Sequence, residues 1–227
     1  MESLRSKVFA TLVAVLLVIV ACEKTTEPTE EQPTFPTFQI TTPSATATSD
    51  TCNLKAYIYA ISVQALAQFS ASFAALPGQN VNGVWTWSVT EDGVTQTLTA
   101  QKQADGSYSW KFVFNGTDEN DQTVYNNWIA MEGTTSADGS TGSLTIYDDS
   151  EVPAQVIYLQ VSWRPVTNGI EITFDQYSSG QPVLRVVLVG YGNGSGEVTE
   201  YVRSGSNWVP TGFHATWSGQ DAVAVCS

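Results

Sequence analysis

One segment of the sequence repeats its apolar residues at intervals of three and four. Between residue 54 and about residue 75 the repeat consists of Leu54, Tyr57, Ile58, Ile61, Ala65, Phe69 and Phe73. This spacing predicts an α-helix, because residues three and four apart share one face of a helix. Asp50 and Thr51 can cap its start, and Leu76-Pro77-Gly78 ends it. The opposite face is mostly alanine with Lys55 as its only charge, so we expect the helix to be buried on more than one side.

Beyond Gly83 the apolar period changes from helical spacing to strict alternation. Trp85, Trp87 and Val89 alternate with polar residues, and the same pattern recurs around Trp110 and Ile172. Alternation predicts half-buried β-strands. Turn signals separate these strands at nine places: Asp92-Gly93, Asp105-Gly106, Asn115-Gly116, Asp138-Gly139, Asp148-Asp149, Asn168-Gly169, Ser179-Gly180, residues 190–196 and Ser204-Gly205. We therefore expect about ten strands, and a last short one over residues 222–226.

Because no second helical pattern separates neighbouring strands, the connections should be hairpins and the sheet an antiparallel meander. About ten twisted strands seldom stay flat, so the sheet should curl into a barrel or half-barrel, or split into a sandwich. The predicted fold is therefore mainly β. The N-terminal helix is expected to lie in the concavity of the curled sheet or to plug its mouth.

The first residues have the pattern of a signal peptide. Arg5 and Lys7 form a positive start, and residues 8–20 are an apolar run interrupted only by Thr11. This run is too short to serve as a permanent membrane span. Its end, Ile19-Val20-Ala21-Cys22, resembles the lipobox of a bacterial lipoprotein. The alternative is an ordinary secretory signal that happens to contain a cysteine.

The lipoprotein resemblance implies cleavage after Ala21, a diacylglycerol thioether on Cys22 and a further acyl chain, such as palmitate, on the new amino terminus. Several acyl chains hold a protein stably on a membrane. In the sorting rule of enterobacterial lipoproteins an aspartate after the lipidated cysteine retains the protein at the inner membrane. Glu23 stands there instead, so the outer membrane is favoured and the leaflet stays open.

Residues 23–51 are rich in Thr, Ser and Pro and contain few side chains able to build a core. This composition predicts a disordered stalk between Cys22 and a single folded domain over residues 52–227. Cys52 and Cys226 bracket that domain. An exported protein meets an oxidising compartment, so we expect them to form a disulfide. Two free thiols are the alternative.

The acidic composition of the chain limits the classes of partner that it can bind. The 227 residues carry 9 basic and 22 acidic side chains, a formal net charge of -13. A chain this acidic, with no Lys/Arg cluster beyond its first residues, is not suited to meet a phosphate backbone, so nucleic acid is excluded as a partner.

The order of lipobox, helix and antiparallel strands resembles the lipid-carrying half-barrel lipoproteins related to LolA and LolB. The resemblance is one of architecture, and it carries no residue motif to particular positions of this sequence. It implies a curled sheet that holds a lipidic ligand.

Catalytic groups are scarce in the predicted domain. His214 is the only histidine, and the alternation around it places it on the outward face of its strand with no nucleophile elbow nearby. Glu171 and Asp175 share a strand face but are some 13 Å apart, too far for a glycosidase pair. We therefore expect no enzyme activity and no cofactor.

Metal and phosphate sites are equally weakly supported. One histidine and no spare thiol exclude the usual zinc and copper ligand sets. Residues 118–121 and 148–151 cluster oxygen ligands that suit calcium, but without EF-hand spacing, so acidic turns are the favoured interpretation. The glycine-rich residues 190–196 precede a strand, which favours a flexible hairpin over a phosphate loop.

Tryptophan is frequent, with seven residues in the chain. Trp85, Trp87 and Trp110 fall on the apolar face of their strands and are expected in the core. Trp128, Trp163, Trp208 and Trp217 are the candidates for aromatics that line the rim of a ligand cavity.

Two functions fit these patterns. The first is a non-catalytic envelope lipoprotein whose curled sheet binds a small apolar or lipidic ligand. The second is a surface-displayed binding or structural module with a solid core, which contacts glycans or envelope proteins through its outer face or loops. An apolar cavity in the folded domain would favour the first function over the second.

Overall fold

The computed structural model describes residues 32–33, 40–44, 50–74, 76–219 and 222–227. These contain the helix α2 (Thr51–Ala74), the short 3-10 helix η2 (Asp149–Glu151) and a twelve-stranded sheet. The strands are β1 (Gln79–Val81), β2 (Val84–Glu91), β3 (Val94–Lys102), β4 (Tyr108–Thr117), β5 (Val124–Thr135), β6 (Gly142–Tyr147), β7 (Ile157–Val166), β8 (Gly169–Ser178), β9 (Gln181–Tyr191), β10 (Gly196–Ser204), β11 (Asn207–Trp217) and β12 (Val225–Cys226).

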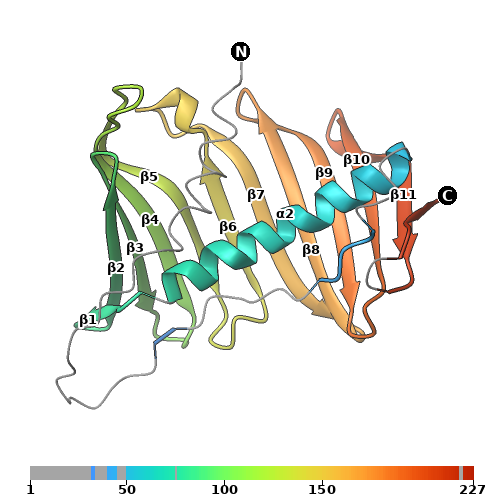
Figure 1. The fold of residues 1–227 in the computed structure, drawn as a ribbon, viewed down its shortest axis with the longest axis horizontal. Helices are drawn as coiled ribbons and strands as arrows, with labels where there is room; N and C mark the ends of the chain where they lie inside the picture. Colours follow the sequence, from blue (N-terminus) through green and yellow to red (C-terminus); the bar gives the residue numbers. More distant parts are fainter. Residues whose placement is uncertain (1–31, 34–39, 45–49, 75, 220–221) are drawn as a thin grey trace.

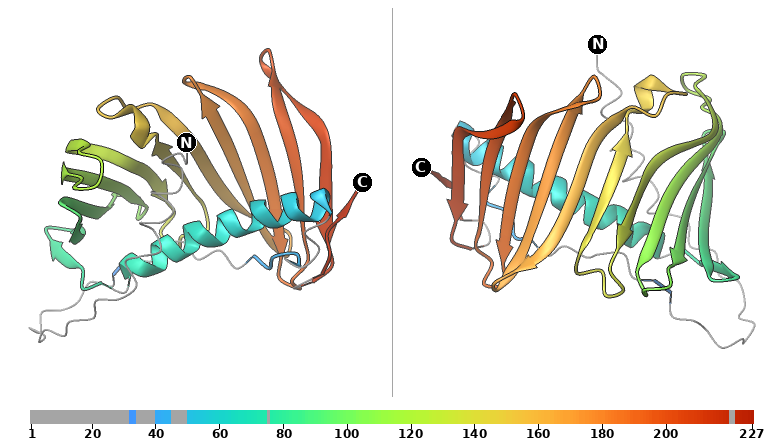
Figure 2. Two further views of the ribbon diagram at one scale, coloured as in Figure 1. Left: turned by 45° about the horizontal axis from the view of Figure 1, so that its top comes forward. Right: turned by 180° about the vertical axis from the view of Figure 1, so that it is seen from behind.

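The sheet is an open antiparallel meander. Each strand pairs with its neighbours in the sequence, so the order runs from β1 to β12 and these two form the edges. The sheet curls into a half-barrel, and α2 crosses its concave side obliquely, from β11 and β12 toward the first strands (Figures 1 and 2). The predicted mainly β fold with one N-terminal helix against a curled meander is therefore confirmed.

The helix begins three residues before the first residue of the apolar repeat. Asp50 caps it as predicted: its side-chain Oδ1 accepts a hydrogen bond from the Cys52 backbone N (2.9 Å), and its carbonyl accepts one from the Leu54 N (3.0 Å). The cap therefore starts α2 at Thr51.

All but one of the predicted turns lie at strand junctions. The prediction is wrong at Asn115-Gly116, which lies inside β4. Gly116 has a φ of 132° beside a shift in the register between β4 and β5, so the pair marks a β-bulge. The chain turns instead over residues 118–123, where the Asp118 N donates to the Thr123 carbonyl (2.9 Å).

Two further differences concern the ends of the sheet. A hairpin at Asn82-Gly83, both with positive φ, adds β1 to the predicted set. The last strand is shorter than expected and covers only Val225–Cys226. The sheet consequently has twelve strands where about ten were expected.

The core fills the space between the concave face and α2. Phe69 and Phe73 of the helix pack there with Trp87, Trp110 and Trp217 of the sheet, all of them buried. The predicted core role of the first tryptophans is thus confirmed for Trp87 and Trp110, while Trp85 is half-buried beside them.

Residues 40–44 fell within the predicted disordered stalk, but the structure packs them against the domain. Ile40 is buried over Gly190, where a Cβ on the glycine would lie 2.9 Å from the Ile40 side chain. The Ser44 N donates to the Ala222 carbonyl (2.9 Å). The stalk prediction is wrong for these residues, because composition does not reveal that the Ile40 side chain packs against Gly190. The rest of the stalk lies mainly outside the described residues.

Candidate functional site

One row of aliphatic side chains crosses the concave face near the loops that join β8 to β9 and β10 to β11. Residues paired across antiparallel strands point to the same face of a sheet, so the register defines the row. Its pairs link β6, β7, β8, β9, β10 and β11 in turn. We call this row the apolar strip; it consists of Ile146, Leu159, Leu184, Val202 and Val209, with Gln176 as its polar member on β8.

The apolar strip is accessible, whereas the next row toward the helix is buried. Val202 and Val209 are 41% and 43% exposed, and the other aliphatic members are half-buried. In the adjacent row Leu144, Val161 and Val186 are all buried. The strand ends that lead into the β8–β9 and β10–β11 loops extend past α2 at the top of Figure 1. A single oblique helix therefore covers one part of the concave face and leaves the strip uncovered by helix.

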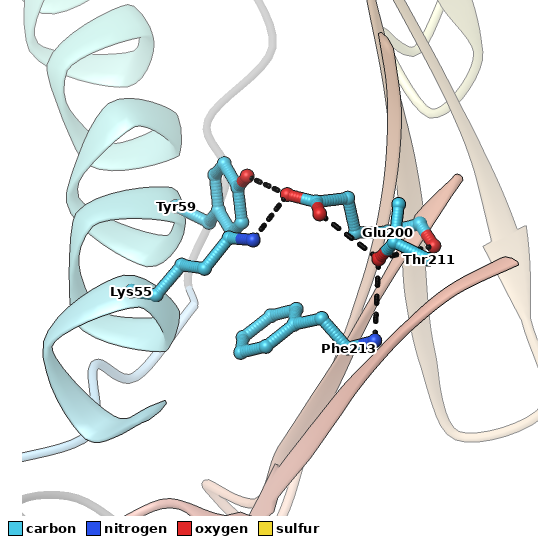
Figure 3. Close-up of polar contacts among 5 residues, drawn as sticks. All are labelled: Lys55, Tyr59, Glu200, Thr211 and Phe213. Atoms are coloured by element: carbon cyan, nitrogen blue, oxygen red, sulfur yellow. Dashed lines mark hydrogen bonds and ion pairs between the residues drawn. The ribbon is translucent and has the colours of Figure 1, made fainter. Parts of the chain in front are cut away.

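A charged cluster lies beside the strip at its β10–β11 end. Figure 3 shows the side chains of this cluster. Glu200, two residues before Val202 on the concave face of β10, is 6% exposed. Its Oε2 atom contacts the Lys55 Nζ at 2.6 Å and accepts a hydrogen bond from the Tyr59 hydroxyl. Its Oε1 atom accepts one from the Thr211 hydroxyl at 2.9 Å. Lys55 and Tyr59 are one helical turn apart, so α2 presents both to the same carboxylate.

Aromatic rings surround the ammonium of this cluster. The Lys55 Nζ lies 4.5 Å from the centre of the Phe213 ring, a cation–π distance, and the Tyr59 ring meets Phe213 edge to face. The Thr211 hydroxyl also accepts a hydrogen bond from the Phe213 backbone N (3.2 Å). The cluster thus ties the first turns of α2 to β10 and β11.

The contacts of Glu200 set its charge state. Burial alone would raise the pKa of this carboxyl, but the hydrogen bonds from Lys55, Tyr59 and Thr211 together outweigh burial, so the pKa lies below its ordinary value. Burial, and then the hydrogen bond to Glu200, raises the pKa of the Tyr59 hydroxyl. At neutral pH the cluster is therefore an ion pair with a neutral tyrosine.

The same flank of α2 is aromatic at its other end. Phe69 and Phe73 each meet the Phe112 ring of β4 edge to face, with ring centres 5.2 Å apart. The opposite flank of the helix faces residues 40–44. There the Gln64 side chain donates to the Ile40 carbonyl (3.1 Å), and the Asn53 side chain donates to the Ser44 carbonyl (2.6 Å). Residues 40–44 thus occupy one side of the helix, and the cluster and the strip lie on the other.

The four candidate rim tryptophans do not belong to the apolar strip. Trp163 and Trp217 are buried in the main core. Trp128 is buried in a smaller cluster with Val94 and Tyr125. Trp208 alternates with Val209 and so points to the convex face, where the guanidinium groups of Arg185 (4.6 Å) and Arg203 (5.3 Å) lie over its ring. Three of the four tryptophans therefore pack in hydrophobic clusters, and the fourth lies on the convex face beside two arginines.

The carboxylates considered for catalysis are engaged in ion pairs on the convex face. Glu171 pairs with Arg164 at 2.7 Å, and Asp175 pairs with Arg185 through two contacts of 2.6 Å. His214 points to the same face, where its Nδ1 lies 2.9 Å from the Thr199 hydroxyl. The structure brings none of these three groups to the apolar strip.

The acidic and glycine-rich segments form turns. Asp118 and Asp148 each accept hydrogen bonds from their own loops, and Asp148 caps η2. Within the described residues, no three His, Cys, Asp or Glu side chains gather closely enough to hold a metal ion. Residues 192–195 connect β9 to β10 as a hairpin loop, as expected.

The signal peptide and the lipidation site Cys22 lie outside the described residues. In the part of the chain that the structure describes, no helix combines the length and apolar character needed to cross a bilayer. The lipid anchor and the outer-membrane location therefore stay predictions.

Comparison with known proteins found no matching protein family, curated protein or solved structure.

Sequence reasoning missed the Lys55–Glu200 pair, although both halves leave a signal. Glu200 has the same parity as Val198, which faces the core, so its carboxylate falls on the apolar side of β10. Lys55 is the only charge in α2. An acid on the buried face of a strand and a lone cation on an apolar helix each need a partner, and pairing them would have placed the helix on β10.

Proposed function

We propose that the protein is a non-catalytic lipoprotein of the bacterial cell envelope that binds a small apolar or lipidic ligand against the apolar strip. The ligand would lie between the strip and the flank of α2 that carries Tyr59 and Phe69.

The accessible aliphatic row is the observation that supports this function. Five aliphatic side chains from five strands line up on a concave surface, with Gln176 of β8 between Leu159 and Leu184. Neighbouring strands are about 4.8 Å apart, so the row extends over roughly 24 Å from β6 to β11. Accessible apolar side chains that gather on a concave face, with a few polar groups among and beside them, are typical of ligand sites.

The anchor explains how such a protein would meet its ligand. Acyl chains on Cys22 would hold the domain at a membrane, with the outer membrane favoured, and residues 23–39 would connect the anchor to Ile40. Eighteen residue steps, from 22 to 40, span at most about 60 Å. The strip would then stay near a lipid surface from which an apolar ligand can be taken.

Native mass spectrometry of the mature chain tests this function. The chain from residue 22 on, with Cys22→Ser to prevent lipidation, is exported behind an ordinary secretory signal peptide and purified from the envelope without delipidation. We expect a species heavier than the protein by the mass of a lipid, which is lost on collisional activation. A ligand-free protein that also takes up no added apolar probe would contradict the proposal and favour a surface module that contacts glycans or other envelope proteins.

A further inference from the structure

The charged cluster and the apolar strip together indicate which class of apolar ligand fits. Glu200 and Val202 are two residues apart on one face of β10, so the cluster lies in the adjacent row, beside the β10–β11 end of the strip. A ligand extended along the strip would have one end beside the Lys55 ammonium. This polarity suits an amphiphile rather than a uniformly apolar molecule.

Lys55 has unused hydrogen-bonding capacity. An ammonium has three N–H donors, and Glu200 is its ion-pair partner. The Lys55 side chain is 39% exposed, whereas the Glu200 side chain is only 8% exposed. The carboxylate oxygens already bind Lys55, Tyr59 and Thr211. The accessible partner for a ligand is therefore the cation.

Among the residues that the structure describes, the arginines of the neighbouring strands point away from the strip and Lys55 points toward its end. The arginines on β7, β9 and β10 are Arg164, Arg185 and Arg203, and strand alternation places all three on the convex face. Helix α2 contains no acidic residue to repel an anion. A carboxylate or phosphate at Lys55 would gain a charge-assisted hydrogen bond.

Resting on the proposed function, we infer that the ligand is a single-chain amphiphile with an anionic head, held with its head at Lys55 and its chain along the apolar strip. Fatty acids carry a carboxylate head, and lysophospholipids or alkyl phosphates carry a phosphate head. Both have the same charge and acceptor chemistry at the ammonium.

Binding of three amphiphiles of equal chain length tests this inference. The dissociation constants of dodecanoate, dodecyl phosphate and dodecanol are measured by calorimetry, below micelle formation, on the mature chain with Cys22→Ser. We expect at least one anion to bind about tenfold more tightly than the alcohol, because a hydrogen bond to a charged group adds about that much. The preferred anion distinguishes a carboxylate from a phosphate source.

Two variants assign the preference to Lys55. Lys55→Met alone leaves a buried carboxylate unpaired, so the double variant Lys55→Met with Glu200→Gln is measured as well. We expect the double variant to bind all three molecules with equal, alcohol-like affinity, and Lys55→Arg to keep the preference. Equal binding of all three to the unaltered protein would overturn the anionic head while leaving the proposed function intact. Binding of none would overturn the proposed function itself.

Discussion

Cys52 and Cys226 form a disulfide whose Cα atoms are 6.1 Å apart, although the residues are separated by 174 positions. The bond joins the first turn of α2 to the last strand, as the two bracketing cysteines predicted. Beside it, the Asn53 side chain accepts a hydrogen bond from the Ala224 N (2.7 Å) while donating to Ser44. The start of the helix is therefore held to both ends of the folded chain.

Removing this disulfide should lower the free energy of unfolding. Chain-entropy arguments for so long a loop give up to about 5 kcal/mol, with native strain and residual denatured structure reducing it. In Cys52→Ser with Cys226→Ser we expect a lower Tm by calorimetry, and amide exchange that increases in α2 before it increases in the central strands. Alkylation of two free thiols in protein taken from its native envelope would contradict the disulfide.

The two kinds of ion pair in the structure should differ in their contribution to stability. Lys55→Met leaves the buried Glu200 without its cation, and we expect a loss of about 2–3 kcal/mol, below the value for a fully buried pair because Lys55 is partly exposed. The matched change Arg164→Met opens the pair with Glu171, in which the arginine side chain is 66% exposed, and should cost under about 1 kcal/mol. Urea unfolding of both variants measures the difference. Equal losses would mean that the Lys55 pair does not stabilise the helix contact.

Glu200 should also give the protein an acid-sensitive component of stability. Its pKa in the folded protein is lower than its ordinary value of 4.5, so its contribution is fully present above that value. As the pH falls, the unfolded chain binds the proton first, and the contribution is lost as the pH passes through the folded pKa. The difference in unfolding free energy between the unaltered protein and Glu200→Gln should therefore shrink as the pH is lowered from neutral to below 4.5. A difference that stays constant over this range would show that the pKa is not lowered.

The predicted anchor is tested at Cys22. With Cys22→Ser, we expect a slower-migrating precursor and no incorporation of labelled palmitate, because the thioether that precedes cleavage cannot form. The matched change Cys52→Ser should leave labelling unaffected. Labelling that persists in Cys22→Ser would overturn the lipobox assignment, and an unaltered protein that is not labelled would favour an ordinary secretory signal.

Much of the fold was predictable because its signals are local. The spacing of Leu54, Ile58 and Ile61 indicates a helix, and alternation around Trp110 and Ile172 indicates strands, each within one short window. Asn115-Gly116 misled because a positive φ serves a bulge as well as a turn. Ile40 was missed because its partner, Gly190, lies 150 residues away in the chain.

The candidate site was less predictable, because it depends on register and on the path of the helix. Alternation places Leu184 and Val202 on the apolar face of their strands, but only the pairing of β9 with β10 sets them side by side. Which of these rows α2 covers depends on its oblique course across the sheet. Sequence reasoning proposed tryptophans as the side chains that line a ligand site, whereas the side chains of the apolar strip are aliphatic apart from Gln176.

The central claim, that an apolar ligand binds on the strip, is tested most directly by two valines on opposite faces of the sheet. Val202 is 41% exposed and belongs to the strip, and Val187 of β9, which pairs with Thr173 and Thr199, is half-buried on the convex face. A neutral apolar fluorophore, N-phenyl-1-naphthylamine, is titrated against the mature chain and against Val202→Asn and Val187→Asn. We expect Val202→Asn to weaken binding several-fold, because it places an amide in the apolar contact, and Val187→Asn to leave binding unchanged. Equal affinities for all three proteins, or a loss confined to Val187→Asn, would contradict the account.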